Sequence, residues 1–174
     1  MRYVSVFIFC LLLSCKNDQK KENPIATIDV LETTNDDLVI VDFDGLKPYL
    51  NKKDDKTYIV NFWATWCGPC VKELPYFEQI GEAYKNKYVE VILVSLDFPR
   101  KYETKLKPYI KENKLKSKVI AFDDLDMNTW IPAINKNWSG AIPATIIYNS
   151  NERKFYERSF TYSELETELK QFIK

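Results

Sequence analysis

The sequence has no histidine among its 174 residues, and this absence excludes several kinds of catalytic site. A Cys–His catalytic pair and a zinc site with histidine ligands both need an imidazole ring. Haem attachment through Cys67 and Cys70 would need histidine as the next residue, and Val71 stands there. Any chemistry therefore depends on other side chains.

An excess of charge of either sign is also missing. The 25 Lys and Arg residues balance 25 Asp and Glu residues, so the overall charge does not indicate a nucleic-acid partner. The sequence has neither internal repeats nor low-complexity segments. Its length fits one domain with a sizeable apolar core.

The first residues have the pattern of an export signal. Arg2 gives a positive start, and residues 4–13 form an apolar run too short to span a bilayer. The sequence Leu-Leu-Ser-Cys at 12–15 resembles the bacterial lipobox, in which the cysteine is acylated and becomes the mature N-terminus. An ordinary secretory signal with an incidental Cys15 is the alternative. We expect a lipoprotein signal peptide at 1–15, a flexible polar tether at 16–24 and a folded domain at 25–174.

The four cysteines then reduce to one functional pair. Export would remove Cys10 and acylation would block Cys15, which leaves Cys67 and Cys70 as free thiols. A single vicinal pair in an exported domain indicates redox chemistry rather than a disulfide framework. The apolar and aromatic run at 57–63 predicts a strand and the residues after Cys70 predict a helix. Cys67 would lie at the helix N-terminus, where the dipole and free N–H groups favour thiolate.

The remaining pattern predicts an α/β domain. The predicted order of strands and helices implies a parallel β-α-β unit followed by an antiparallel hairpin, with the cysteines at the carboxyl end of a central strand. Gly45 is expected to break the first strand, and Pro75 to kink the helix after the cysteines. Strands are predicted at 38–43, 57–63, 89–96, 119–122, 142–148 and 154–159, with a further short strand within 24–34. Helices are predicted at 46–50, 71–86, 100–118, 126–137 and from 162.

The segment Asn-Phe-Trp-Ala-Thr-Trp-Cys-Gly-Pro-Cys at 61–70 resembles thioredoxin-fold proteins, and in particular the membrane-anchored TlpA/ResA-like thiol-disulfide oxidoreductases. The resemblance extends from Leu38 to the C-terminus. It implies a thioredoxin-like fold, with a central mixed β-sheet flanked by helices and a helix-strand insertion between residues 96 and 126. Pro75 falls where the family kinks its active-site helix. Ile142 and Pro143 resemble the family's cis-proline loop, which lies beside the cysteines.

The resemblance also implies residue roles. Cys67 would attack a client disulfide and Cys70 would resolve the mixed disulfide. Asn61 stands where thioredoxin has a buried aspartate, so Glu73 becomes the candidate proton acceptor for Cys70. The alternatives are that water takes the proton and that Glu73 is an ordinary acid in the first turn of a helix. The residues expected to shape the active site and bind clients are Trp66, Gly68, Pro69, Ile142 and Pro143.

The function implied is that of an extracytoplasmic protein-disulfide reductase. Its redox group would be the Cys67–Cys70 disulfide, with neither a metal nor an organic cofactor, and Gly-Pro between the cysteines favours reduction over oxidation of clients. Clients would be exported proteins, with apocytochrome c as one candidate, and electrons would come from a membrane donor of the DsbD/CcdA type. The protein would be lipid-anchored in a bacterial cell envelope and face the periplasm. The alternatives are a disulfide oxidase or isomerase of the same fold, a thiol peroxidase and a non-catalytic lipoprotein binding module.

Overall fold

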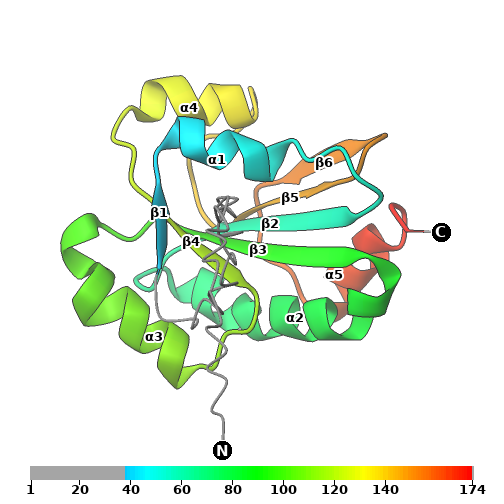
Figure 1. The fold of residues 1–174 in the computed structure, drawn as a ribbon, viewed down its shortest axis with the longest axis horizontal. Helices are drawn as coiled ribbons and strands as arrows, with labels where there is room; N and C mark the ends of the chain where they lie inside the picture. The colour runs from blue at the N-terminus through cyan, green and yellow to red at the C-terminus, as the bar shows by residue number, and fades with distance from the viewer. Residues whose placement is uncertain (1–37, 174) are drawn as a thin grey trace, which may run out of the picture. The chain divides into compact units, whose positions relative to one another are not determined.

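The computed structural model describes residues 38–173, whose strands form one six-stranded sheet (Figure 1). The strand order is β1-β4-β3-β2-β5-β6. The first four strands in this order are parallel, and β5 and β6 run antiparallel to their neighbours. The predicted parallel unit followed by an antiparallel pair is therefore confirmed. The strands are β1 (Val39–Val41), β2 (Thr57–Trp63), β3 (Val89–Ser95), β4 (Lys118–Phe122), β5 (Ala144–Tyr148) and β6 (Arg153–Tyr156).

Helices cover both faces of the sheet. In Figure 1, α1 and α4 lie above the sheet, and α2, α3 and α5 lie below it. Apolar side chains fill the space on each face, so the molecule has one hydrophobic cluster on either side of the sheet. The helices are α1 (Phe43–Leu50), α2 (Gly68–Tyr84), α3 (Lys107–Glu112), α4 (Met127–Ile134) and α5 (Tyr162–Leu169).

Strand β2 is central, because it pairs with β3 on one side and with β5 on the other. All of its residues are buried. Ile59 and Trp63 belong to the cluster between the sheet and α2. Val60 and Phe62 belong to the cluster on the opposite face, between the sheet and helices α1 and α4. Since side chains alternate along a strand, Asn61 is on the α2 side of the sheet.

The first helix begins earlier than predicted. We expect Gly45 to break a strand and the helix to start at Leu46, but α1 begins at Phe43 and includes Gly45. Asp42 explains the difference, because its Oδ1 accepts a hydrogen bond from the backbone N of Gly45 at 2.9 Å. This is the geometry of a helix N-cap, which satisfies a backbone donor that the first turn leaves free.

The predicted helix at 100–118 is shorter and less regular than expected. It consists of a 3₁₀ turn at Pro99–Lys101, a π turn at Tyr102–Leu106 and α3, which ends at Glu112. Lys114 has a φ of 51°, a left-handed conformation that does not continue a right-handed helix. The segment between β3 and α4 nevertheless contains a helix and a strand, α3 and β4, as the predicted insertion does.

The other boundaries differ by a few residues. The helix predicted at 126–137 ends at Ile134, the strand predicted from 142 begins at Ala144, and β6 ends at Tyr156 rather than at Ser159. The helix predicted from Tyr162 begins there, with Thr161 as its N-cap.

Several predictions concern residues before Leu38. The signal peptide, Cys10, the lipobox with Cys15, the tether at 16–24 and the strand within 24–34 lie outside the described residues. Within residues 38–173, no helix is both long and apolar enough to cross a membrane.

Candidate active site

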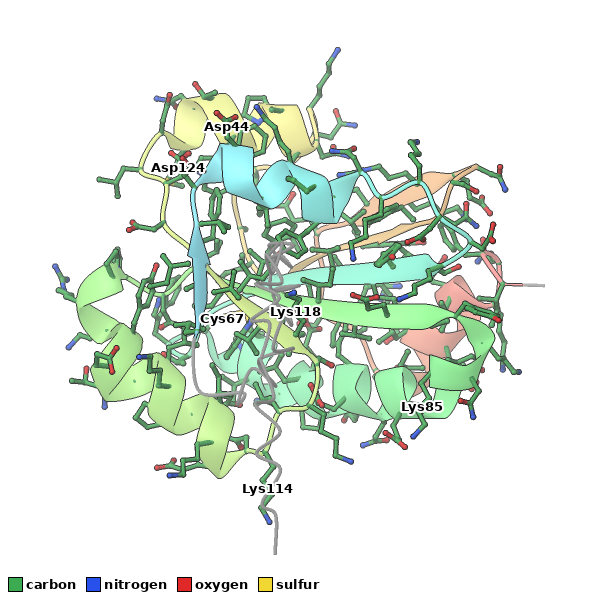
Figure 2. The ribbon with its side chains drawn as sticks, viewed as in Figure 1. Asp44, Cys67, Lys85, Lys114, Lys118 and Asp124 are labelled. Atoms are coloured by element: carbon green, nitrogen blue, oxygen red, sulfur yellow. A yellow bond between two sulfur atoms is a disulfide. The ribbon has the colours of Figure 1, made fainter. Side chains whose placement is uncertain are left out.

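Cys67 and Cys70 are joined by a disulfide at the N-terminus of α2. Cys67 is the N-cap residue of this helix, and its Sγ accepts a hydrogen bond from the backbone N of Cys70 at 3.3 Å. Figure 2 shows Cys67 close to the start of α2. The Cys67 residue is 6% exposed and Cys70 is fully buried. An incoming thiol or disulfide would therefore meet Cys67 first.

The backbone around the pair is open toward the helix N-terminus. A Cβ atom placed on Gly68 would meet no atom within 4 Å, so this residue is not enclosed by its neighbours. Pro69 lies in the first helical turn, where its missing N–H leaves no hydrogen bond unmade. Both residues are exposed, as expected for positions next to a reactive sulfur.

The loop before β5 brings Ile142 and Pro143 to the disulfide. The peptide bond between these two residues is cis, as the sequence resemblance predicts. The carbonyl oxygen of Ile142 lies 3.7 Å from Sγ of Cys67. Trp138 fixes the loop upstream, because its Nε1 donates to the carbonyl oxygen of Ala141 at 2.8 Å. The loop from the antiparallel part of the sheet thus lies beside the cysteines.

Trp66 precedes the disulfide on a loop that is tied to the end of β3. Asp97 accepts hydrogen bonds from the backbone N of Thr65 at 3.0 Å and from its Oγ1 at 2.5 Å. The hydroxyl of Ser95 also donates to Asp97, at 2.9 Å. The next residue on each loop is a large exposed apolar side chain, Trp66 at 60% and Phe98 at 52% exposure. The edge beside Cys67 therefore carries apolar surface held by a buried carboxylate.

Glu73 lies on α2, three residues after Cys70, and is almost fully buried. Its Oε1 accepts a hydrogen bond from Nδ2 of Asn61 at 2.9 Å, and its Oε2 accepts one from the backbone N of Phe160 at 2.7 Å. Nδ2 of Asn61 also donates to Oγ1 of Thr145 at 3.1 Å, on the neighbouring strand. Burial raises the pKa of Glu73 to about 7, and the hydrogen bonds from Phe160 and Asn61 offset part of this rise.

A carboxyl with this pKa is suited to proton exchange near neutral pH. Residues three apart on a helix share a face, so Glu73 and Cys70 lie on the same side of α2. An ordinary helix acid would be exposed to solvent, whereas Glu73 is buried and bonded to Asn61 of β2 and to the backbone of Phe160.

Apart from Cys15, which lies outside the described residues, the predicted site residues lie at one end of the sheet, and the structure adds three groups that we do not predict. These are Asp97, Thr145 and the backbone N–H of Phe160. A signal for Asp97 exists, since it directly follows a strand whose carboxyl end lies beside that of β2. Thr145 follows only from the register of β5 on β2, and the sequence carries no sign of the Phe160 contact.

Metal ligands do not gather in the described part of the chain. Within residues 38–173, no group of three Cys, Asp or Glu side chains has the arrangement of a metal site. The redox-capable group that the geometry provides at this end of the molecule is the disulfide itself.

A mixed sheet of this order, with a disulfide at a helix N-terminus beside a cis-proline loop, defines a thioredoxin-like protein. The chain belongs to the AhpC/TSA family, whose model matches residues 36–153. The chain is also similar to a thiol-disulfide oxidoreductase ResA from Bacillus cereus, with 38% identity over 78 residues, which are 45% of this chain and 43% of that protein. A ResA from Oceanobacillus iheyensis is 48% identical over 48 residues, 28% of this chain and 25% of that protein. The predicted resemblance to ResA-like proteins is thereby confirmed, although the chain spans less than half the length of these relatives.

Solved structures support the fold. The crystal structure of StoA from Bacillus subtilis matches with a TM-score of 0.53 and 24% identity, covering 68% of this chain and 84% of that one. A thioredoxin-related protein from Neisseria meningitidis serogroup B matches with a TM-score of 0.58 and 22% identity, covering 68% and 85%. At these identities the likeness establishes the thioredoxin-like fold, as predicted.

Proposed function

We propose that this protein is an extracytoplasmic thiol-disulfide oxidoreductase that reduces disulfides in exported proteins. The observation that carries the proposal is the Cys67–Cys70 disulfide at the N-terminus of α2, with Sγ of Cys67 3.7 Å from the Ile142 carbonyl oxygen. The matched relatives are named thiol-disulfide oxidoreductases, which supports the same activity here. Apocytochrome c is one class of client compatible with this chemistry.

The reaction starts from the dithiol form of the pair. Cys67 is the more exposed sulfur, and the helix N-terminus favours its thiolate. This thiolate attacks one sulfur of a client disulfide, so a Cys67–client bond forms, the client S–S bond breaks and a client thiolate leaves. The thiolate of Cys70 then attacks the sulfur of Cys67 and releases the second client thiolate. The client gains two electrons, and the pair ends as the disulfide seen in this structure.

The resolving step needs Cys70 to lose its proton in a buried place. Glu73 is the proposed acceptor, because it lies on the same face of α2 and has a pKa of about 7. The proton moves from the Cys70 thiol to the Glu73 carboxylate as the thiolate forms. Asn61 cannot take this proton, since an amide is not basic at neutral pH.

The client would bind at the edge that surrounds Cys67. Trp66 offers exposed apolar surface on one side, and Ile142 and Pro143 form the other side. A client segment in extended conformation would pair with the backbone at Ile142 and present its disulfide to Cys67. This arrangement would leave Cys70 covered until the mixed disulfide has formed.

The oxidised pair must be reduced again before another turnover. We assign this step to a membrane dithiol donor of the DsbD/CcdA type, which would pass two electrons through the same thiol exchange. Acylation at Cys15 would hold the domain near such a donor on the periplasmic side of the bacterial envelope.

Cysteine variants test the activity. We expect Cys67→Ser to abolish insulin reduction, and Cys70→Ala to accumulate mixed disulfides whose partners can be identified from membrane extracts.

The reduction potential of the Cys67–Cys70 pair, measured against glutathione, should lie near about −270 mV rather than near about −120 mV. A potential at the higher value would indicate an oxidase, and consumption of peroxide by the wild type would indicate a thiol peroxidase. A disulfide that resists mild reductant in the folded protein would indicate a non-catalytic binding module.

A further inference from the structure

The amide of Asn61 leaves one of its two polar atoms without a partner in the protein interior. Nδ2 donates to Glu73 and to Thr145, while Oδ1 is buried and has no hydrogen-bond partner among the described residues. Asn61 is fully buried, so Oδ1 is not facing bulk water. An orphaned carbonyl of this kind is unusual, because most buried polar atoms are paired.

We propose that the Asn61 amide reverses its orientation when Glu73 takes up a proton, so that Nδ2 faces the carboxylate and Oδ1 faces the carboxylic acid. The proposal rests on the proposed function for its role in the reaction. It makes Asn61 a positioning residue, which acts through Glu73 rather than on the reacting sulfurs.

The backbone decides which oxygen of Glu73 can carry the proton. Oε2 faces the N–H of Phe160, which is a donor in every protonation state, at 2.7 Å. A proton on Oε2 would weaken this hydrogen bond, because the hydroxyl oxygen of a carboxylic acid is a poorer acceptor than its carbonyl oxygen. The proton is therefore favoured on Oε1, the oxygen that faces Asn61.

Protonation of Oε1 then conflicts with the present orientation of Asn61. Nδ2 lies 2.9 Å from Oε1 and can only donate, so an O–H there would again face a donor. Rotation of the amide by half a turn removes the conflict, because it brings Oδ1 to the same place as an acceptor. Oδ1, which has no partner beside the carboxylate among the described residues, thus becomes the partner of the acid, and Nδ2 takes the position that Oδ1 had.

Thr145 allows both orientations. Its hydroxyl accepts from Nδ2 at 3.1 Å in the present state, and a hydroxyl can equally donate. Among residues 38–173, we find no acceptor for the Thr145 hydroxyl, so its proton is free to bond Oδ1 once the amide has turned. Glu73 and Thr145 thus bond Nδ2 in the present state and Oδ1 after the amide has turned.

Few other charges face Glu73. Within residues 38–173, Arg158, on the connection between β6 and α5, is the one charged group that acts on it appreciably, and it lowers the pKa of Glu73. Arg158 itself forms an ion pair with Glu164 at 3.2 Å. From α2 the neighbouring group is Cys70, which does not titrate as a disulfide, and from β2 and β5 the neighbours are the uncharged Asn61 and Thr145. In the oxidised protein, a response of Asn61 near neutral pH would thus report Glu73.

The test is a pH titration of the oxidised protein by NMR. We expect the side-chain ¹⁵N and ¹H signals of Asn61 to shift between pH 5 and 9 with the midpoint of the Glu73 Cδ signal. Asn149 is the internal control, because its Nδ2 donates to the backbone oxygen of Phe172, which does not titrate. Its signals should stay constant over the same range.

The variant Glu73→Gln provides a locked state. The amide oxygen of the substituted side chain should accept from the N–H of Phe160. Its NH₂ group should face Asn61 as the O–H of the carboxylic acid does. The Asn61 signals of Glu73→Gln should therefore stay near their low-pH wild-type position at every pH. Asn61 signals that do not move while Glu73 titrates, or that resemble the high-pH state in Glu73→Gln, would overturn the proposal. A Glu73 signal that does not titrate would overturn it as well.

Failure of the proposed function would look different. If the titration and the Glu73→Gln variant both give the expected Asn61 signals but the wild type does not reduce insulin, the reversal stands and the reductase assignment falls. If insulin is reduced but Asn61 does not respond, the reductase stands and the reversal falls.

Discussion

At the scale of single residues, the buried carboxyl of Glu73 links the candidate site to stability. Burial raises its pKa to about 7, whereas in the unfolded chain the ordinary value is 4.5. The folded protein therefore holds this proton more tightly than the unfolded chain does. The contribution of Glu73 to stability is full below about pH 4.5 and is lost as the pH rises through about 7.

The change can be measured with Glu73→Gln, which does not titrate. We expect the unfolding free energy of the wild type, relative to that of the variant, to fall by about 3 kcal/mol between pH 4.5 and 8, because each pKa unit corresponds to about 1.4 kcal/mol. Urea denaturation of both oxidised proteins at several pH values gives the comparison. Glu78→Gln, on the same helix, shows whether loss of any carboxylate from α2 gives the same profile. If the difference in unfolding free energy between wild type and Glu73→Gln does not change with pH, the raised pKa of Glu73 is contradicted.

At the scale of elements, Asp97 joins the loop after β2 to the end of β3. Its carboxylate accepts from the backbone and hydroxyl of Thr65 and from the hydroxyl of Ser95. We expect Asp97→Ala to lower the unfolding free energy by about 2 kcal/mol, because three buried or half-buried donors lose their acceptor. We also expect a several-fold loss of kcat/KM in insulin reduction, since Trp66 and Cys67 follow this anchor directly.

A neighbouring aspartate serves as the control for Asp97. Asp123 follows β4 as Asp97 follows β3, but its side chain is exposed, so Asp123→Ala should change the unfolding free energy by less than about 0.5 kcal/mol. Equal effects of the two substitutions, measured in urea, would mean that the hydrogen bonds of Asp97 do not hold the loops together.

The elements also show what periodicity could and could not predict. Strands β2 and β3 are long apolar runs whose burial on both faces fixes them, and the sequence predicts both with boundaries correct to within one residue. The start of α1 depends on one capping contact of Asp42, which pattern alone does not weigh. The helix predicted to reach residue 118 ends at Glu112, because Lys114 turns the chain out of helical geometry.

The candidate active site could likewise be predicted from the sequence only in part. Cys67, Cys70 and the Ile142–Pro143 loop are predictable because a recognisable motif carries them. Glu73 bonds Asn61 on β2 and Phe160 on the connection after β6, and Asn61 in turn bonds Thr145 on β5, so the network joins segments far apart in sequence. Their meeting depends on the register between β2 and β5 and on the path of a loop, so no local pattern could predict it.

At the scale of the whole molecule, both layers of helices serve to hold β2 in the middle of the sheet. The hydrophobic clusters on the two faces meet at this strand, and its carboxyl end leads directly to Cys67. A central parallel strand with a helix after it places a reactive group at the sheet edge, where the loops of neighbouring strands can surround it. The disulfide therefore has the packed sheet beneath it, and Cys67 lies on its more exposed side.

Membrane attachment of the domain is expected to depend on Cys15. The sequence Leu-Leu-Ser-Cys at 12–15 predicts acylation of Cys15, which would make membrane attachment depend on one sulfur. In a bacterial host, Cys15→Ser should prevent incorporation of labelled palmitate and move the protein from the detergent phase to the aqueous phase. Cys10→Ser is the matched control, since Cys10 lies within the apolar run of the signal and should leave both readouts unchanged. Because acyl chains bind the bilayer through buried hydrocarbon rather than through charge, an acylated protein should resist a salt wash. Equal partitioning of wild type and Cys15→Ser would show that the attachment does not depend on this cysteine, and the ordinary secretory signal would then be the correct interpretation.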